Sequence, residues 1–325
     1  MRAPLNRIVD GALELSVVGS FSDIGYRVRR RVDDWDTIDR RNVEGRAVLV
    51  TGTTSGLGRA TAARLAGMGA RVWLGVRDAE RGAKVRDELR DATGNDEIRL
   101  MVADLGDLPA VRDAAAGVVE EAGALDAVVH NAGALTDQRR ETAAGIELTL
   151  ATHVVGPYVL TRAVQDALAP GARIVFVSSG GMYTQGFDLD RLEMDADAYR
   201  GAVAYARAKR AQVVLSRALA AELRGRAVSH AMHPGWANTP GIGDSLPGFS
   251  GLIGPILRSA EHGADTIVWL VGSEEAGRTT GLFWLDRRPR STVRIPGRSA
   301  PPDAEGELVR WLDERVRRAD AVTTG

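Results

Sequence analysis

A tyrosine and a lysine four residues apart are the side chains of this sequence best suited to acid–base chemistry. The chain has 42 basic residues, of which only Lys84 and Lys209 are lysines, and Lys209 follows Tyr205 in the stretch "AYARAKRAQ". Positions i and i+4 share one face of a helix, so the phenol and the ammonium would be neighbours. Lysine offers a movable charge whose pKa responds to burial, which arginine does not. The spacing indicates a proton-transferring phenol beside a cation, although a surface lysine of a long helix would give the same pattern.

A glycine-rich turn lies upstream of this pair. The stretch "TGTTSGLG" places Gly52, Gly56 and Gly58 between a β-branched run, "RAVLVTG", and a helical pattern, "GRATAARLAGMG". Such a turn lets the backbone approach a diphosphate closely, and the free N–H groups at the start of the helix attract its charge. Because a strand precedes the turn and a helix follows it, the motif indicates a dinucleotide site.

The end of the second expected strand bears on which dinucleotide binds. NAD-binding proteins usually place an acid there, which accepts hydrogen bonds from the adenosine ribose. The matching stretch "WLGVRD" has Val76 and then Arg77. A guanidinium suits the 2′-phosphate of NADP, so NADP is favoured over NAD. We interpret Asp78 as the N-cap of the next helix rather than as an acid displaced by one place.

Strand and helix patterns alternate along the chain, which predicts right-handed βαβ crossovers. The expected fold is therefore α/β: a doubly wound, Rossmann-type parallel sheet with helices on both faces, in a single domain. Strands are expected at residues 46–52, 70–77, 97–105, 125–133, 172–179, 227–235 and 281–286. Helices are expected at residues 58–69, 78–94, 108–123, 147–168 with a break near Gly156 and Pro157, 199–224, 259–273 and around 304–318.

This domain is expected to span residues 45–286, between an N-terminal arm, 1–44, and a C-terminal linker and helix, 287–325. Residues 236–257 or thereabouts are rich in glycine, proline and apolar residues, which is typical of a mobile lid. A lid of this composition would close over an apolar small molecule. A segment that merely packs on the core would have the same composition.

The composition excludes several functions. Without cysteine the chain has no disulfide, thiolate nucleophile or cysteine metal site, and a cytoplasmic location fits. The formal net charge of −1 gives no overall basic field for nucleic acid. No metal site is expected, because the acids between residues 188 and 197 lack a calcium-loop pattern and are read as a solvated face. His230 and His233 lack further ligands.

The N-terminal arm combines an apolar stretch with a basic run, "YRVRRRVDDW". Asp10 and Glu14 interrupt the apolar stretch, so it fits neither a membrane span nor a signal peptide. The basic run could make a peripheral contact with an acidic membrane surface. A solvated or docked amphipathic arm is the favoured reading.

The motifs together resemble those of the short-chain dehydrogenase/reductase family, in the family's order and over about 240 residues. The matching features are "TGTTSGLG", "AD" at 103–104, "NAG" at 131–133, "VSS" at 177–179, "YARAK" at 205–209 and "HPGWANT" at 233–239. The stretches "VSSGGM", "MHPGWANTPG" and "GADTIVWL" resemble the member 12 subgroup more closely still. The resemblance implies hydride transfer between a nicotinamide and a carbonyl or alcohol.

The resemblance also implies roles for individual residues. Tyr205 would be the general acid/base, Lys209 would lower its pKa and hold the nicotinamide ribose, and Ser179 would bond the reacting oxygen, with Ser178 as the fallback. Tyr205 and Lys209 would therefore also touch the cofactor. The other expected cofactor-binding residues come from the turn, from Arg77 and from the resemblance. They are Gly52, Thr53, Ser55, Gly56, Leu57, Gly58, Arg77, Asp104, Leu105, Asn131, Ala132, Gly133, Pro234, Gly235 and Thr239.

The sequence departs from the family where an asparagine is usual, because His153 stands there. In the family, the backbone of that residue binds a water that links the lysine to a proton relay. A distorted helix could present the same carbonyl, His153 could titrate near neutrality and join the relay, or proton transfer could be impaired. Tyr183 and Tyr199 are rival phenols, but neither has a lysine four residues later.

Two functions remain open at this level. The favoured one is an NADP-dependent reductase or dehydrogenase, and the alternative is a catalytically weak, dinucleotide-binding regulatory or scaffold protein. The resemblance also makes a homo-oligomer possible, paired through the long helices beside the site. An arm or tail that covers those helices would leave a monomer.

Overall fold

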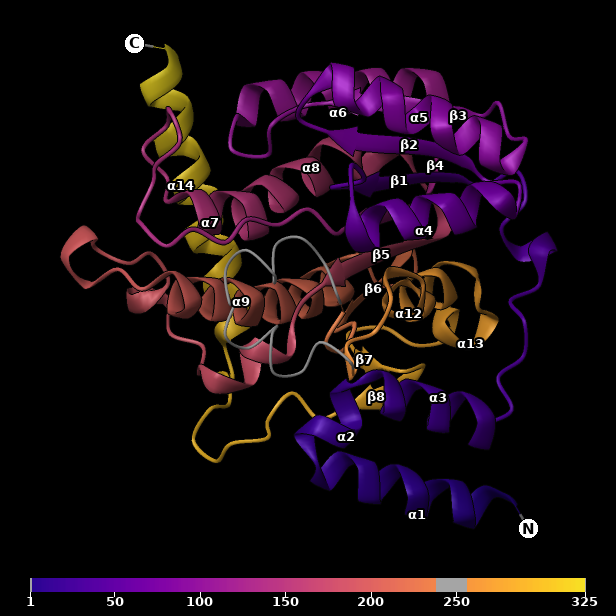
Figure 1. Ribbon diagram of the computed structural model, residues 1–325. Helices are drawn as coiled ribbons and strands as arrows, with labels where there is room; N and C mark the ends of the chain where they lie inside the picture. Colours follow the sequence, from indigo (N-terminus) through magenta and orange to yellow (C-terminus); the bar gives the residue numbers. More distant parts are fainter. Residues whose placement is uncertain (1, 238–255, 325) are drawn as a thin grey trace.

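The computed structural model describes residues 2–237 and 256–324, and its centre is an eight-stranded sheet (Figure 1). The strand order is β3-β2-β1-β4-β5-β6-β7-β8, and every neighbouring pair is parallel except β7 and β8. The strands are β1 Ala47–Thr51, β2 Arg71–Val76, β3 Ile98–Val102, β4 Leu125–His130, β5 Leu168–Val177, β6 Ala227–Met232, β7 Phe283–Leu285 and β8 Arg288–Arg290. The predicted doubly wound parallel sheet is confirmed, and β8 extends it past the boundary expected at residue 286.

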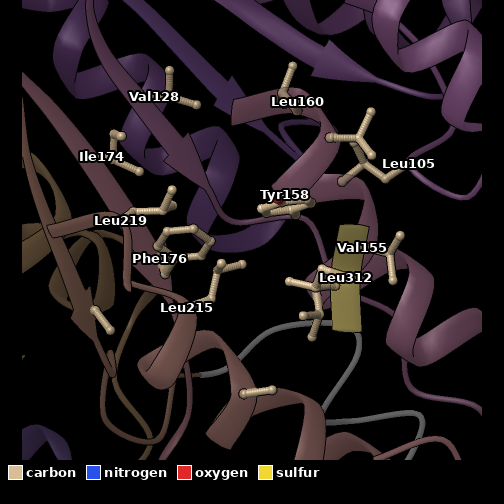
Figure 2. Packing of buried hydrophobic residues seen from close by; sticks show 14 of the residues in the cluster. Leu105, Val128, Val155, Tyr158, Leu160, Ile174, Phe176, Leu215, Leu219 and Leu312 are labelled. Carbon is tan, nitrogen blue, oxygen red and sulfur yellow. The ribbon is translucent and has the colours of Figure 1, made fainter. Parts of the chain in front are cut away.

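Helices cover both faces of the sheet because successive side chains of each strand point to opposite faces. In β1, Val48 and Val50 join one buried cluster and Leu49 joins the other. The helices α4 Gly56–Gly67, α5 Ala79–Thr93 and α12 Ala260–Gly272 pack on the first cluster. The helices α6 Leu108–Ala122, α8 Gly156–Val164 and α9 Gly201–Glu222 pack on the second, part of which Figure 2 shows.

The helix starts follow the local signals of the sequence. The side chain of Asp78 accepts a hydrogen bond from the backbone N–H of Arg81 at 2.9 Å, so its reading as the N-cap of α5 is confirmed. The same helix ends at Gly94, whose φ of 65° is left-handed, a conformation that glycine adopts without strain. These two caps fix where α5 begins and ends.

The helix expected at residues 147–168 is divided into shorter pieces. It comprises α7 Leu148–Leu150, a π-helical turn at residues 151–155, α8 and a short 3₁₀ turn at 165–167. The break therefore lies one turn before Gly156 and Pro157. A Cβ on Gly156 would lie 2.3 Å from the carbonyl oxygen of Leu105, so only glycine allows the close approach of α8 to the loop after β3.

The N-terminal arm is docked along the β8 edge of the sheet (Figure 1). It forms α1 Arg2–Leu15, α2 Val17–Phe21 and α3 Asp23–Val32, and Asp10 of α1 pairs with Arg290 of β8 at 2.7 Å. Arg29, inside the basic run, is 1% exposed and also bonds Asp10, at 2.7 Å. A docked arm covers a strand edge that would otherwise expose unpaired backbone groups. Within the residues described, no helix has the length and apolarity to cross a membrane.

The C-terminal helix α14, Ala304–Thr324, packs across α9 on the second face (Figure 1). It buries Leu308 and Leu312 completely and pairs Glu305 with Arg217 of α9 at 3.2 Å. The tail therefore occupies part of the helix that the family resemblance assigns to pairing between subunits. The remaining short elements are α13 Glu274–Gly277 and 3₁₀ turns at 40–42, 180–184, 189–191 and 196–198.

Candidate active site

The candidate site lies where the strand order reverses, between β1 and β4. Doubly wound sheets bind ligands outside the carboxyl ends of the strands at this point. The turn from β1 into α4 passes over it, with Gly52 at φ 72° and Gly56 at φ 54°. The segments that follow β4, β5 and β6 reach the same edge, so residues far apart in the sequence meet there.

The glycine-rich turn is built for close backbone approach. A Cβ on Gly52 would lie 2.6 Å from the Cα of Ala132, and a Cβ on Gly58 would lie 2.2 Å from the carbonyl oxygen of Gly52. Ser55 precedes α4 without making a capping hydrogen bond from its side chain. The N–H groups at the start of α4 therefore keep their capacity to bind an anion.

Thr51 and Asn131 lock the turn to the loop after β4. The hydroxyl oxygen of Thr51 accepts hydrogen bonds from the backbone N–H groups of Asn131 and Ala132, both at 3.0 Å. The side-chain amide of Asn131 donates to the carbonyl of Thr51 at 2.8 Å. The amide of Asn131 is thus engaged in holding two strand ends together. Thr51 did not stand out in the sequence, because its role depends on a residue 80 positions away.

The segments that follow β2 and β3 carry the residues expected near the adenosine. Asp104 accepts a hydrogen bond from the backbone of Gly106 at 2.8 Å, and Leu105 beside it is buried. Arg77 follows β2 directly and is exposed. Thr53 is fully buried, and its hydroxyl donates to the carbonyl of Gly75 at 3.5 Å. Leu57 is half-buried against Gly263 of α12.

Tyr205, Lys209 and Ser179 meet at the ends of β5 and α9. The Lys209 ammonium lies 5.5 Å from the centre of the Tyr205 ring and donates to the carbonyl of Val177 at 2.7 Å. Ser179 lies beside the phenol of Tyr205, and its hydroxyl oxygen accepts from the backbone N–H of Gly181 at 3.2 Å. The hydroxyl of Ser178 is buried and donates to the carbonyl of Lys209 at 2.8 Å. Ser178 is therefore occupied in anchoring α9, which leaves Ser179 as the hydroxyl beside the phenol.

Burial perturbs both titratable groups of this cluster. Loss of solvent raises the pKa of Tyr205, and the hydrogen bond with Ser179 opposes that rise. Burial lowers the pKa of Lys209 to about 7, because an ammonium loses its hydration. The phenol is thus protonated at neutral pH, and the ammonium is poised between its two forms.

His153 lies in the π-helical turn, and its ring packs edge-on against Tyr205 with centroids 5.3 Å apart. Its Nε2 is 2.8 Å from the carbonyl oxygen of Ala134, and its ring occupies the space that a Cβ on Gly133 would need. Burial, with the nearby charge of Lys209, lowers the pKa of His153 well below its usual value. A neutral, buried imidazole does not fit titration near neutrality, whereas the distorted turn fits the reading in which the backbone carbonyl acts.

The rival phenols have structural partners. The Tyr183 hydroxyl donates to the carbonyl of Ser291 at 2.9 Å, and the Tyr199 hydroxyl donates to Glu147 at 3.0 Å. The acidic stretch between them is not wholly a solvated face as expected, because Glu193 pairs with Arg315 of α14 at 3.2 Å. The pair joins segments 122 residues apart, which no local pattern indicates.

The loop after β6 forms the remaining wall. Gly235 has a φ of 76°, and its backbone N–H donates to Nδ1 of His233 at 3.0 Å. The carbonyl of Pro234 accepts a hydrogen bond from Arg258 at 3.2 Å. Thr239 and most of the expected lid, 238–255, lie outside the described residues.

Two further residues of the site escaped the sequence analysis. Phe21, from the arm, packs against His233 with ring centroids 4.3 Å apart and fills the space beside Gly180. Gln212 bonds Lys209 at 3.1 Å. Gln212 lies three residues after the lysine, on the same helix face, and this spacing was a usable signal. Nothing local to Phe21 indicates that it reaches the site.

Comparisons with known proteins agree with this geometry. Residues 46–245 match the family model of the short chain dehydrogenases. Dehydrogenase/reductase SDR family member 12 of Bos taurus is 37% identical over 282 residues, covering 85% of this chain and 88% of that protein. Retinol dehydrogenase 12 of Homo sapiens is 32% identical, covering 76% and 80% of the two chains.

Solved structures are also similar. A short chain dehydrogenase from Burkholderia cenocepacia in complex with NADP is 29% identical, with a TM-score of 0.61 and coverage of 74% of this chain and 96% of that chain. The model match, the sequence relatives and the shared fold lead to one conclusion. The chain belongs to the short-chain dehydrogenase/reductase family and is an oxidoreductase of alcohol and carbonyl groups.

Proposed function

We propose that the protein is an NADPH-preferring reductase of an apolar carbonyl compound, in which Ser179, Tyr205 and Lys209 are the catalytic residues. The observation that carries the proposal is the buried ammonium of Lys209 beside the ring of Tyr205, with Ser179 next to the phenol. A buried cation, a phenol and a hydroxyl at one strand end form a site for a developing oxyanion. The reverse reaction, oxidation of the alcohol, would use the same groups.

The turn and its neighbours fit a dinucleotide. Glycines at 52 and 58 let the turn pack tightly against Ala132 and against itself, and the start of α4 supplies N–H donors for a diphosphate. Asp104 and the loop after β4 would border the adenosine, and Pro234 and Gly235 would border the nicotinamide. These residues follow three separate strands, β3, β4 and β6, so no single sequence motif contains the proposed cofactor site. Bound there, the cofactor would supply the hydride.

Each catalytic side chain then has a distinct task. Tyr205 donates its phenolic proton to the substrate oxygen as that oxygen gains negative charge, and burial favours the protonated phenol from which the step starts. Ser179 donates a second hydrogen bond to the same oxygen. Lys209, half charged near pH 7 and more fully charged below it, stabilises the phenolate that remains. The ring of His153 supports the phenol by packing against it. The backbone carbonyl of His153 accepts a hydrogen bond from the side chain of Gln212.

The preference for NADPH rests on Arg77. Its exposed guanidinium follows β2, at the place where the ribose 2′ position is recognised in doubly wound folds. Asp78 is occupied as a helix cap, so it does not supply the acid that NAD-binding proteins place there. The similar structure from Burkholderia cenocepacia, which holds NADP, agrees with this choice.

An apolar substrate is supported by the wall that faces the strand ends. Trp236 follows Gly235 directly, and its ring meets Phe21 at right angles with centroids 5.9 Å apart. A relative named retinol dehydrogenase is 32% identical to this chain, and retinol is an apolar alcohol. The aromatic wall would exclude water from the reacting carbonyl.

The arm is proposed to contact an anionic membrane surface as well. The buried ion pairs of Arg29 remove the centre of the basic run from this role. Exposed apolar residues instead lie on α1 and α2, with Ile8 69% and Leu15 91% exposed, beside Val17 and Val18. Arg7, next to Ile8, is also exposed. Apolar and basic residues together are typical of interfacial helices.

Replacing Tyr205 by phenylalanine removes the proton donor and keeps the ring. We expect NADPH-dependent reduction of apolar aldehydes and ketones to fall at least about 100-fold in kcat/KM, while NADPH affinity changes little. Tyr199→Phe, which removes a phenol bonded to Glu147, is the matched control and keeps its activity. The loss of absorbance at the NADPH band measures the turnover of both variants. Tight cofactor binding with no turnover above the phenylalanine variant would favour the regulatory function.

Replacing Arg77 by serine tests the cofactor preference. We expect KM for NADPH to rise roughly 10- to 100-fold, because a charge-assisted phosphate contact is lost, with a smaller change for NADH. Arg86→Ser, further along α5 and paired with Asp87, is the control for loss of positive charge. Equal effects on both cofactors would show that Arg77 does not recognise the 2′-phosphate.

The buried ammonium gives the folding stability a defined pH dependence. Lysine titrates near 10.5 when unfolded and near 7 at position 209 in the folded chain, so between these values the unfolded chain holds the extra proton. The free energy of unfolding of the wild type should therefore rise with pH across this window, by about 1.4 kcal/mol per pH unit relative to Lys209→Met. Urea denaturation of both proteins between about pH 6 and pH 9 measures the difference. A constant difference above pH 7 would contradict the lowered pKa.

Binding of the arm to lipid can be measured by sedimentation with anionic vesicles. A double variant, Leu15→Ser with Val18→Ser, should lower the partition coefficient roughly tenfold, because two exposed apolar side chains leave the interface. Val322→Ser alters a side chain of similar exposure, 61%, on α14 and is the control. If both proteins and the wild type sediment equally, the arm does not contact the membrane.

A further inference from the structure

The ammonium of Lys209 is held by two oxygen atoms of this chain. It donates to the carbonyl of Val177 at 2.7 Å and to the side-chain oxygen of Gln212 at 3.1 Å. Lys209 is 3% exposed and Gln212 is fully buried. Both residues lie on α9, so the amide approaches the ammonium from one turn further along the helix. Neither acceptor is a carboxylate, so the ammonium is solvated by dipoles.

The other end of the Gln212 amide reaches a different helix. Its nitrogen donates to the backbone carbonyl of His153 at 2.9 Å, within the π-helical turn. In an α-helix this carbonyl would accept from the residue four places on, which here is Pro157 and has no N–H. A buried carbonyl without a donor is costly, and the amide of Gln212 supplies one.

We propose that Gln212 is a positioning residue that ties the ammonium of Lys209 to the carbonyl of His153. The proposal rests on the function proposed above. A side-chain amide spans directly the interval that the family resemblance assigns to a water molecule. The link fixes the ammonium beneath the Tyr205 ring and fixes the turn that carries the His153 ring against the same phenol.

The chemistry of an amide sets what this link can do. An amide oxygen accepts from the ammonium and an amide nitrogen donates to the carbonyl, so both ends are satisfied in one orientation only. An amide neither takes up nor releases a proton near neutral pH. Gln212 therefore orients Lys209 without carrying protons between His153 and Tyr205.

The experiment uses the full chain labelled with ¹³C-lysine. Only two lysines are present, and Lys84 is exposed, so the Cε signal of Lys209 is resolved and assigned with Lys84→Arg. Gln212→Leu removes both hydrogen bonds. We expect the titration midpoint of Lys209 to fall by about one pH unit, since the charged form loses an acceptor. In the same variant kcat should fall roughly 10- to 100-fold, with KM changed less.

Two further variants separate this role from packing. Gln212→Glu keeps an acceptor for the ammonium and adds a negative charge, so the midpoint of Lys209 should rise. Ser216→Ala removes another buried hydrogen bond of α9, between Ser216 and Ser229, and should leave the midpoint unchanged. If Gln212→Leu does not fold, the rise in Gln212→Glu is the deciding result.

The outcomes are distinct from those that test the proposed function. The titration needs no substrate. A protein without turnover would contradict the proposed reductase function, whereas a shifted midpoint of Lys209 would still support the link through Gln212. A midpoint that moves in neither Gln212 variant overturns the proposal. An equal shift in Ser216→Ala overturns it too, because the effect would then come from general loosening of α9.

Discussion

One buried carboxylate, Asp286, joins the three parts of the molecule that meet behind the site. It accepts from Arg29 of the arm at 2.6 Å and from Arg258 at 2.5 Å, and all three side chains are 1% exposed. Asp286 sits in the tight turn between β7 and β8, where its φ of 53° is one that aspartate tolerates better than most residues. Removing it would take from the buried Arg258 the carboxylate that it bonds and would leave Arg29 with Asp10 and Glu14 alone, which is far costlier than losing a surface pair.

The position of this cluster explains why the arm is part of the site. Arg258 also donates to the carbonyls of Phe21 and Pro234, at 3.1 and 3.2 Å, so a single guanidinium fixes the arm and the loop after β6 together. A Cβ on Gly235 would lie 2.3 Å from that guanidinium, which makes glycine necessary there for packing as well as for φ. The aromatic wall of Phe21 and Trp236 is consequently set by charges buried behind it, and the arm is not an appendage.

The sequence predicted those features whose causes are local. The cap of Asp78, the turn at Gly52 and Gly58 and the spacing of Tyr205 and Lys209 each depend on a few consecutive residues, and the structure has each in place. Features that needed the tertiary fold were missed or shifted. Gln212 gains its role from a carbonyl 59 residues away and Phe21 from contacts with the loop after β6, more than 200 residues along the chain. The role of each residue in catalysis stays a prediction.

The choice of lysine at position 209 now has a physical explanation. Two buried guanidiniums behind the site pair with carboxylates, Arg258 with Asp286 and Arg290 with Asp10. At position 209 the partners are a carbonyl and an amide, and burial brings the pKa of the ammonium to about 7. An arginine there would bring a larger, planar fork in place of a compact ammonium on a flexible stem. A lysine held by neutral dipoles keeps its positive charge available to the phenolate, and this is the one place in the core where the chain uses it.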